Sequence, residues 1–341
     1  MEVSALPTPL RIEDSSQVFA ARRIATRLAQ ELGFDAAAAG HVALIVTEIG
    51  TNILKHGGGG EMLVQTVCRD DVRGLQIIGL DRGKGIADVG RSLRDGYSTA
   101  GSPGTGLGAI RRMSASFDIC SAPGQGTAVA ATLWARTPSP STTRGPRVAV
   151  GVASAAHAGE SVSGDAWAME QGPARTVLLV VDGLGHGLIA AEAAREAVRL
   201  FRDNARHAPR AVVQALHDGM RTTRGGAATV TEIDSDRGVV RFAGIGNISA
   251  TIVSPGGRRH LVSHNGTVGH TVRRIDEFTY PWPKDGVLIQ HTDGLATHWD
   301  VERYPGLLAR SPSLIAGVLY RDFHRARDDV TVLVAREATR A

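Results

Sequence analysis

A chain of 341 residues is longer than one ordinary hydrophobic core needs, and it suits two domains of about 130–190 residues each. Its hydrophobic fraction of 43% indicates packed cores rather than disorder. The formal net charge is only +4 and the basic residues are scattered, which argues against nucleic-acid binding. There is no basic leader followed by an apolar run and no continuous apolar stretch of about 18 residues, so we expect a cytoplasmic protein that does not bind membranes.

Residues 136–146 have the composition of a linker, because they combine proline, serine and threonine with no large apolar side chain. They separate a first domain at 8–135 from a second at 147–337. The two cysteines, Cys68 and Cys120, have neither metal-type nor redox-type spacing. We expect both to be reduced and buried like small apolar residues.

The first half is predicted to be α+β. A helix at 14–32 can be capped by Asp14 or Ser15 and stops before Gly33, and a second helix is expected at 35–56. A short helix is predicted at 108–114, and strands are predicted at 62–68, 75–81, 116–121 and 127–135. This order favours an α/β sandwich with its helices on one face of a mixed sheet.

The second half is rich in predicted strands. They are expected at 148–153, 167–171, 176–182, 227–233, 238–244, 249–254, 286–292 and 329–335. Two helices interrupt them, at about 187–204 and 209–222. The pattern predicts a β-sandwich flanked by helices.

Three polar residues recur on one face of the second predicted helix. Glu48 and Asn52 lie four positions apart, and Lys55 lies close to the same line. The carboxylate could take a proton from an attacking hydroxyl, the amide oxygen could bind magnesium, and the lysine could meet a phosphate. The alternative is a solvated face of an amphipathic helix.

Asp81 ends an apolar strand and is followed by Gly83 and Gly85. An aspartate held by glycines at a strand end can accept a hydrogen bond from an adenine amino group. The alternative is an Asp-Gly type of turn, which needs no ligand.

A glycine-rich run precedes the short helix at 108–114 and consists of Gly104, Thr105, Gly106, Leu107 and Gly108. Its backbone N–H groups could close over phosphates at the start of that helix. The run is not a Rossmann fingerprint, because no strand leads into it, and it is not a P-loop, because no Lys-Ser or Lys-Thr follows it.

In their order and spacing, these motifs resemble the GHKL (Bergerat) ATPases, in particular the anti-sigma-factor serine/threonine kinases of the stressosome switch (RsbT) type. The resemblance spans nearly all of residues 8–135 and implies a kinase that uses ATP and Mg²⁺. It implies that Glu48 is the catalytic base and that Asn52 holds the metal. The implied ATP-binding residues are Asn52, Lys55, Asp81, Gly83, Gly85, Gly104, Thr105, Gly106, Leu107, Gly108 and Thr127. No phosphoacceptor-histidine helix pair precedes Glu48, so a two-component histidine kinase does not fit.

Four aspartates of the second half stand at or near predicted strand ends. Asp182 and Asp293 each end an apolar run and precede a glycine, Asp165 follows a glycine, and Asp328 precedes the last strand. Carboxylates delivered from distant positions can hold two hard cations about 4 Å apart. A single Asp-Gly can equally be a turn, but four such positions in one half favour a metal site.

These residues resemble the metal-dependent PPM phosphatases of the bacterial SpoIIE and RsbX type, over nearly all of residues 146–337. The resemblance implies two Mn²⁺ or Mg²⁺ ions bridged by Asp182 with the Gly183 carbonyl, and completed by Asp165, Asp293 and Asp328. The basic residue with which eukaryotic members bind the substrate phosphate has no evident counterpart. His186 could be a general acid or simply a loop residue.

Together the halves predict a bifunctional enzyme of a bacterial partner-switching pathway. Its expected partner is a STAS-domain anti-sigma antagonist or a stressosome-like scaffold, phosphorylated by one half and dephosphorylated by the other. Two alternatives stay open: a first half that only binds ATP and a partner beside a working phosphatase, or a nucleotide-hydrolysing enzyme with no protein partner.

Overall fold

The computed structural model describes residues 4–5, 9–69, 72–93, 106–137, 147–325 and 327–338. The chain forms two compact units. One contains residues 2–140 together with Asp300–Arg321, and the other contains 141–299 and 322–341. The boundary near residue 140 lies within the predicted linker. No sequence pattern predicted that Asp300–Arg321 belongs to the N-terminal unit.

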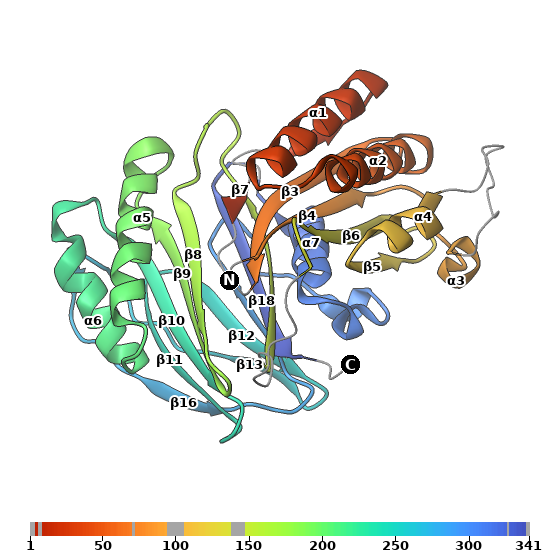
Figure 1. The fold of residues 1–341 in the computed structure, drawn as a ribbon. Coiled ribbons are helices and arrows are strands. Elements are labelled where there is room, and N and C mark those ends of the chain that lie inside the picture. The colour runs from red at the N-terminus through yellow and green to blue at the C-terminus, as the bar shows by residue number, and fades with distance from the viewer. Residues whose placement is uncertain are drawn as a thin grey trace. The chain divides into compact units, whose positions relative to one another are not determined.

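The N-terminal unit is built on an antiparallel sheet whose one face is covered by the two long helices near the N-terminus (Figure 1). Its strands are β1 (Ser4–Ala5), β2 (Leu10–Ile12), β3 (Gly60–Arg69), β4 (Val72–Asp81), β5 (Ser116–Ser121) and β6 (Thr127–Trp134). They run in the order β1-β3-β4-β6-β5, with β2 also paired to β3. Every pairing is antiparallel, so the expectation of a mixed sheet was wrong. The cause is local: β3 leads directly into β4, and such a short connection can join only antiparallel neighbours.

The helices of this unit begin and end where the capping residues stand. They are α1 (Ser15–Glu31), α2 (Ala36–Asn52), the π-helical turn η1 (Ile53–Gly57), α3 (Val89–Ser92) and α4 (Gly106–Met113). Asp14 caps α1 in a reciprocal capping box with Gln17, and Asp35 caps α2. The predicted helices at 14–32 and 35–56 are thereby confirmed, except that α2 ends in a π-turn.

The core of this unit lies between the sheet and α1 and α2. Val42, Ile45 and Ile49 of α2 are fully or almost fully buried against Ile77 of β4. Gly79 lets the helix approach, because a Cβ at that position would stand 2.2 Å from Ile49 Cγ2. By length and composition alone Ala36–Gly57 could also cross a membrane, but the core helix of a globular unit passes the same test.

The segment Asp300–Arg321 completes this unit. It contains two 3₁₀ turns, η3 (Val301–Arg303) and η4 (Leu307–Ala309), and most of α7 (Pro312–Phe323). Side chains alternate across a strand, so Ile78 and Leu80 point away from the α1–α2 face. Gly317 of α7 lies against both, since a Cβ there would be 3.0 Å from Ile78 Cγ2 and 3.3 Å from Leu80 Cδ2.

The C-terminal unit is built on two five-stranded antiparallel sheets, ordered β16-β11-β10-β9-β8 and β13-β12-β17-β18-β7, with the small pair β14-β15 beside them. The strands are β7 (Val148–Ala155), β8 (Asp165–Gln171), β9 (Arg175–Gly183), β10 (Gly226–Asp234), β11 (Val239–Ile245), β12 (Ser249–Ser254), β13 (Gly257–His260), β14 (Gly266–Thr267), β15 (Thr271–Val272), β16 (Phe278–Pro281), β17 (Val287–His291) and β18 (Val330–Glu337). Each predicted strand of this half is present, with bounds that move by a few residues.

Two helices cover the β8–β11 sheet (Figure 1). They are α5 (Gly187–Asn204) and α6 (Pro209–Gly219), and the 3₁₀ turn η2 (Met220–Thr222) follows. Both helices match their predicted ranges. Ala193, Ala197 and Phe201 of α5 pack on Val177 and Leu179 of β9. The unit is therefore the expected β-sandwich with helices outside.

Candidate active sites

The nucleotide motifs of the first half gather where α2 and β4 end. Glu48 and Asn52 lie on the last turns of α2, are both partly buried, and are followed by Lys55, which is exposed on the π-turn η1. π-turns are uncommon and often mark functional positions. This π-turn ends at Gly57, one residue beyond the predicted helix end at residue 56. The sequence predicted a plain helix through Lys55 and no π-turn.

Asp81 is the most tightly held residue of this group. Its Oδ1 accepts the backbone N–H groups of Gly83, at 2.9 Å, and Thr127, at 3.1 Å. Burial raises the pKa of this carboxyl, and the two N–H groups act in the opposite direction. Glycines are required around it: a Cβ at Gly57 would stand 2.4 Å from Asp81 Cβ, and one at Gly126 2.1 Å from Asp81 O.

The glycine motif after Asp81 is fixed by close backbone packing. A Cβ on Gly83 would stand 2.3 Å from His56 O, and Gly85 adopts φ +69° with Ala122 O at 1.9 Å from a would-be Cβ. Thr127 starts β6, and its hydroxyl lies 3.0 Å from Ser121 Oγ. Asp81, Gly83, Gly85 and Thr127 are thus brought together, as their predicted shared role requires.

The second glycine run is only partly described. Gly106, Leu107 and Gly108 form the first residues of α4, with Gly108 buried. The predicted contacts of Gly104 and Thr105 fall outside the described residues, so their roles stay predictions.

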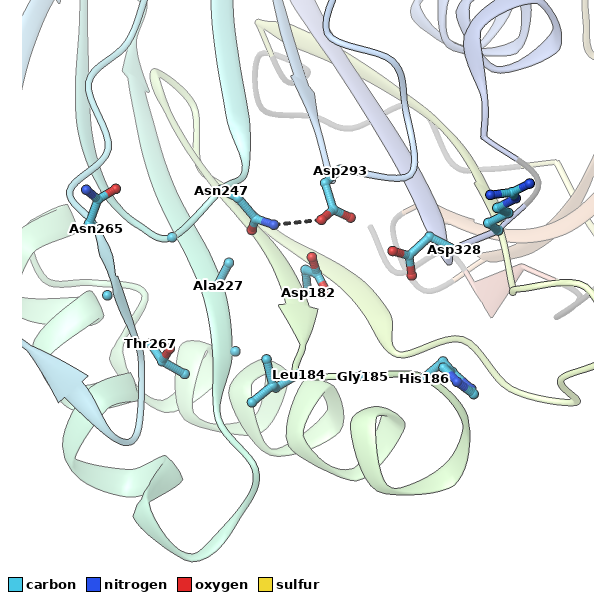
Figure 2. A pocket seen from close by; sticks show the side chains of 14 residues that line it. Asp182, Leu184, Gly185, His186, Ala227, Asn247, Asn265, Thr267, Asp293 and Asp328 are labelled. Atoms are coloured by element: carbon cyan, nitrogen blue, oxygen red, sulfur yellow. Dashed lines mark hydrogen bonds between the residues drawn. The ribbon is translucent and has the colours of Figure 1, made fainter.

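The aspartates of the C-terminal unit converge on one cavity of about 490 Å³ (Figure 2). Asp182 stands at the end of β9, Asp293 follows β17, and Asp328 precedes β18. All three carboxylates line the cavity, and Figure 2 shows them turned toward a common space. Three of the four predicted aspartates are thus brought together, whereas Asp165 is not among the residues that line the cavity. That they bind metal stays a prediction.

Burial and repulsion between carboxylates dominate the electrostatics of this cluster. Burial, followed by the nearby carboxylates of Asp293, Asp328 and Asp329, raises the pKa of Asp182 to about 7. Burial and the Asp328 carboxylate also raise the pKa of Asp293. Like charges held at such short range favour protonation unless a cation screens them.

Asp165 lies beside Asp182, because the two residues face each other across the antiparallel pair β8–β9. Its Oδ2 accepts the Thr292 hydroxyl at 2.7 Å. Its Oδ1 is buried and accepts no hydrogen bond from any residue that the structure describes. A buried carboxylate oxygen is costly to leave without a partner, so this atom suits a bound ion or water.

These groups fit a hard divalent cation: they are oxygen donors, they repel one another, and one of them carries an unsatisfied buried oxygen. Within the described ranges, no three His, Cys, Asp or Glu side chains come close enough to enclose an ion unaided. Water or substrate oxygens would therefore have to complete the shell, as is usual for Mg²⁺.

Gly183 is constrained on the side of α5. A Cβ there would stand 2.4 Å from Ala190 O, and its N–H donates to Gly164 O at 3.0 Å. The metal-binding role of its carbonyl stays a prediction.

His186 lines the same cavity but is held by its neighbours. Its Nδ1 lies 2.7 Å from Glu160 Oε1, and its ring stacks on His157 with centroids 5.1 Å apart. The residue precedes α5 without a side-chain capping bond. Both sequence-based interpretations, general acid and loop residue, are compatible with this position.

Among the residues of the cavity that were not predicted, three carry polar groups of interest. Arg327 lines the cavity beside Asp328 in sequence. Asn247 donates to Asp293 Oδ2 at 2.7 Å (Figure 2). Asn265 lies on the opposite rim. Arg327 adjoins the predicted Asp328 in sequence and Asn247 follows β11, but their proximity to the cavity arises only in the folded sandwich.

Comparison with known proteins agrees with this division. Residues 13–133 match the histidine kinase-like ATPase domain family, and residues 172–337 match the Stage II sporulation protein E (SpoIIE) family. The serine/threonine-protein kinase RsbT of Bacillus subtilis is 33% identical over 127 residues, which make up 37% of this chain and 96% of RsbT. The chain belongs to the histidine kinase-like ATPase family. It fuses such an RsbT-like domain to a SpoIIE-type phosphatase domain.

The second half is similar to another protein of the same bacterium, the phosphoserine phosphatase RsbX, at 25% identity over 138 residues, covering 40% of this chain and 69% of RsbX. The structure of RsbX in complex with magnesium superposes with a TM-score of 0.50 at 21% identity over 56% of this chain and 96% of that one, which supports the fold. A structure from work on the bacterial stressosome, described as a modular system adapted to control secondary messenger signaling, has 27% identity and a TM-score of 0.52 over 55% of this chain and 99% of that one.

The protein is accordingly an enzyme that combines a GHKL-type serine/threonine kinase domain with a PPM-type protein phosphatase domain. Its similarities are those of a partner-switching regulator.

Proposed function

We propose that this chain is a bifunctional switch enzyme, which phosphorylates and dephosphorylates a serine or threonine on a STAS-domain anti-sigma antagonist or a stressosome-like scaffold in the bacterial cytoplasm. The observation that carries the proposal is the presence of two separate sets of reactive groups in one chain. One is Glu48 with Asn52 near the strand-end Asp81, and the other is the carboxylate cluster around Asp182. The first set suits transfer from ATP and the second suits hydrolysis.

In the kinase half, Asp81 would accept a hydrogen bond from the adenine amino group, Asn52 would offer its amide oxygen to Mg²⁺, and Lys55 would contact a phosphate. Glu48 lies one helical turn before Asn52 and takes the proton of the protein hydroxyl. The backbone around Gly104, Thr105, Gly106, Leu107 and Gly108 covers the phosphates. Catalysis then depends on positioning and charge stabilisation, as in other phosphoryl transfers.

In the phosphatase half, Asp182 would be the shared ligand of two Mn²⁺ or Mg²⁺ ions, with help from the Gly183 carbonyl, and Asp165, Asp293 and Asp328 would complete the set. Bound metal supplies a water of lowered pKa and neutralises charge on the phosphate. Arg327 lines the same cavity, which supports a role for it in binding the substrate phosphate by a charge-assisted hydrogen bond.

The alternative is that the first half only binds ATP and a partner, while the phosphatase half alone is active. Glu48 favours transfer, because a site that merely holds nucleotide needs no base beside its magnesium ligand. The two interpretations differ in whether the γ-phosphate of ATP is transferred to the partner protein.

The test is to incubate the full chain with candidate STAS proteins and γ-labelled ATP, with and without Mn²⁺, and to follow phosphoserine over time. Asp182→Ala should let label accumulate and Glu48→Gln should prevent incorporation. A STAS protein that Asp182→Ala never labels, although the wild type dephosphorylates the same protein when it is supplied already phosphorylated, would favour the binding-module alternative.

A further inference from the structure

The segment Asp300–Arg321 offers a link between the two activities. In sequence it lies between Asp293 and Asp328 of the phosphatase site, yet in space it belongs to the N-terminal unit. Residues Pro312 to Arg321 of α7 are all buried. A piece of the second half of the sequence therefore forms part of the folded kinase unit.

Polar contacts fix this segment at both ends. At its start, Gln125 Nε2 donates to Arg303 O at 2.8 Å, and Ser311 N donates to Asp118 Oδ2 at 2.6 Å. At its end, the Tyr320 hydroxyl donates to Glu61 Oε2 at 3.0 Å. With Gly317 packed on β4 between them, these contacts set both the position and the register of α7.

Arg321 makes the contact that matters most for the nucleotide site. Only 6% of this residue is exposed, and its Nη1 donates to the backbone oxygen of Asp81 at 2.9 Å. The carboxylate of the same Asp81 holds Gly83 N and Thr127 N. Arg321 thus hydrogen-bonds to the main chain of Asp81, the residue whose side chain holds the backbone at the proposed adenine-binding end of the site.

The segment is also tied to the phosphatase site through the backbone at its base. Ala296 N donates to Phe323 O at 2.8 Å, and Arg325 N donates to Gly294 O at 2.7 Å. These bonds join the stretch of chain that leads into the segment to the stretch that leaves it. The first stretch comes directly after Asp293 and the second ends shortly before Asp328. The helix α7 runs to Phe323, so the element that carries Arg321 ends at the first of these two hydrogen bonds.

We propose that Asp300–Arg321 is a positioning segment of the nucleotide site, that Arg321 is its positioning residue, and that nucleotide bound beside Asp81 changes the phosphatase site through this segment. This inference rests on the proposed function of the two sites. Binding linkage is reciprocal, so metal at the phosphatase site changes nucleotide affinity by the same factor. Such coupling provides a way to keep the kinase and the phosphatase from consuming ATP in a futile cycle.

The experiment uses the full chain with millimolar Mn²⁺ throughout. Binding of the non-hydrolysable analogue AMP-PNP is measured by calorimetry, and hydrolysis of p-nitrophenyl phosphate is measured with and without saturating AMP-PNP. The variants are Arg321→Met, Arg321→Lys, which keeps the charge, and the control Arg303→Met, which makes the same change at an exposed position of the same segment. If Arg321→Met folds poorly by circular dichroism, Arg321→Gln is measured in its place.

We expect Arg321→Met to weaken AMP-PNP binding about tenfold, because a charged hydrogen bond to a buried carbonyl is lost. Arg321→Lys should recover most of that loss, and Arg303→Met should match the wild type. AMP-PNP should change wild-type hydrolysis at least about fivefold. At concentrations that saturate Arg321→Met, it should change hydrolysis by that variant much less.

Wild-type affinity in Arg321→Met, or an equal loss in Arg303→Met, would overturn the positioning role. Wild-type hydrolysis that ignores saturating AMP-PNP would overturn the coupling. A wild-type chain that binds no AMP-PNP at all would instead refute the proposed kinase site itself, which keeps the two failures distinguishable.

Discussion

Asp165 and Asp182 stand directly opposite each other on the antiparallel strands β8 and β9, so their carboxylates share one face of the sheet. Burial, and then the charge of Asp182, raise the pKa of Asp165 well above its ordinary value, and the pKa of Asp182 is raised to about 7. A directly opposed pair of like charges destabilises a sheet unless something compensates it. The pair is therefore a structural argument for a cation at this edge.

The first prediction concerns the pH dependence of the metal-free protein. The folded state keeps a proton on Asp182 up to about pH 7, whereas the unfolded chain releases it near 3.8. The folded state then binds more protons across this window, so stability is greatest at its acidic end and falls as pH rises toward 7. Thermal unfolding with a chelator should show Tm falling between pH 5 and 7.5.

Mn²⁺ should remove this trend, because a bound cation favours the charged carboxylates. Asp182→Asn should flatten the chelated profile, whereas Asp236→Asn, a change at an exposed aspartate, should leave it as in the wild type. A chelated wild type that gains stability steadily from pH 5 to 7.5 would contradict the raised pKa.

The second prediction separates bridging from terminal ligands. Asp182→Ala should reduce metal-dependent release of phosphate from a phosphoserine protein by about 100-fold or more, because a bridging anion screens two dications from each other. Asp328→Ala removes a ligand from one ion only and should leave activity recoverable at high Mn²⁺. Steady-state rates across a Mn²⁺ titration provide the measurement. A folded Asp182→Ala variant with normal activity would sink the binuclear assignment.

The third prediction separates chemistry from binding in the kinase half. Glu48→Gln should keep ATP affinity but slow transfer to a protein serine by about 100-fold, since the amide cannot accept a proton. Glu31→Gln makes the same change at an exposed position of α1 and serves as the control. Transfer at the wild-type rate by Glu48→Gln would mean that positioning alone is sufficient.

Local patterns were enough to predict most of the fold. Asp14 and Asp35 cap the two long helices as their side chains allow, and the apolar runs became the strands of both units. The caps and strands depend on residues close in sequence and on simple alternation along a strand. The meeting of the strand-end aspartates does not, because Asp182 ends β9 in one sheet whereas Asp293 and Asp328 adjoin β17 and β18 in the other.

What the sequence did not reveal depends on contacts between distant residues. The α7 segment carries apolar residues all round and no strong period, so nothing local indicates that Gly317 packs on Ile78 and Leu80. The bond from Arg321 to Asp81 joins residues 240 positions apart. Nothing in the sequence distinguishes Arg327 from the other arginines, and only the folded structure shows that it lines the cavity.

The last prediction follows from the face of β4 that α7 covers. Leu63, Ile78 and Leu80 are no more than 4% exposed, and Leu63 pairs with Ile78 across β3 and β4. A fragment that ends at residue 140 lacks Asp300–Arg321 and uncovers this side of the strand. Since burying each large apolar side chain contributes about 1.5–3 kcal/mol, the fragment should lose several kcal/mol of unfolding free energy and tend to associate.

Appending residues 300–323 through a flexible linker should restore stability. The same appendage with Gly317→Leu should not, because the new side chain would clash with Ile78. Urea unfolding and light scattering of the three fragments measure this, and a bare fragment as stable and monomeric as the appended one would show that α7 is dispensable for the kinase fold.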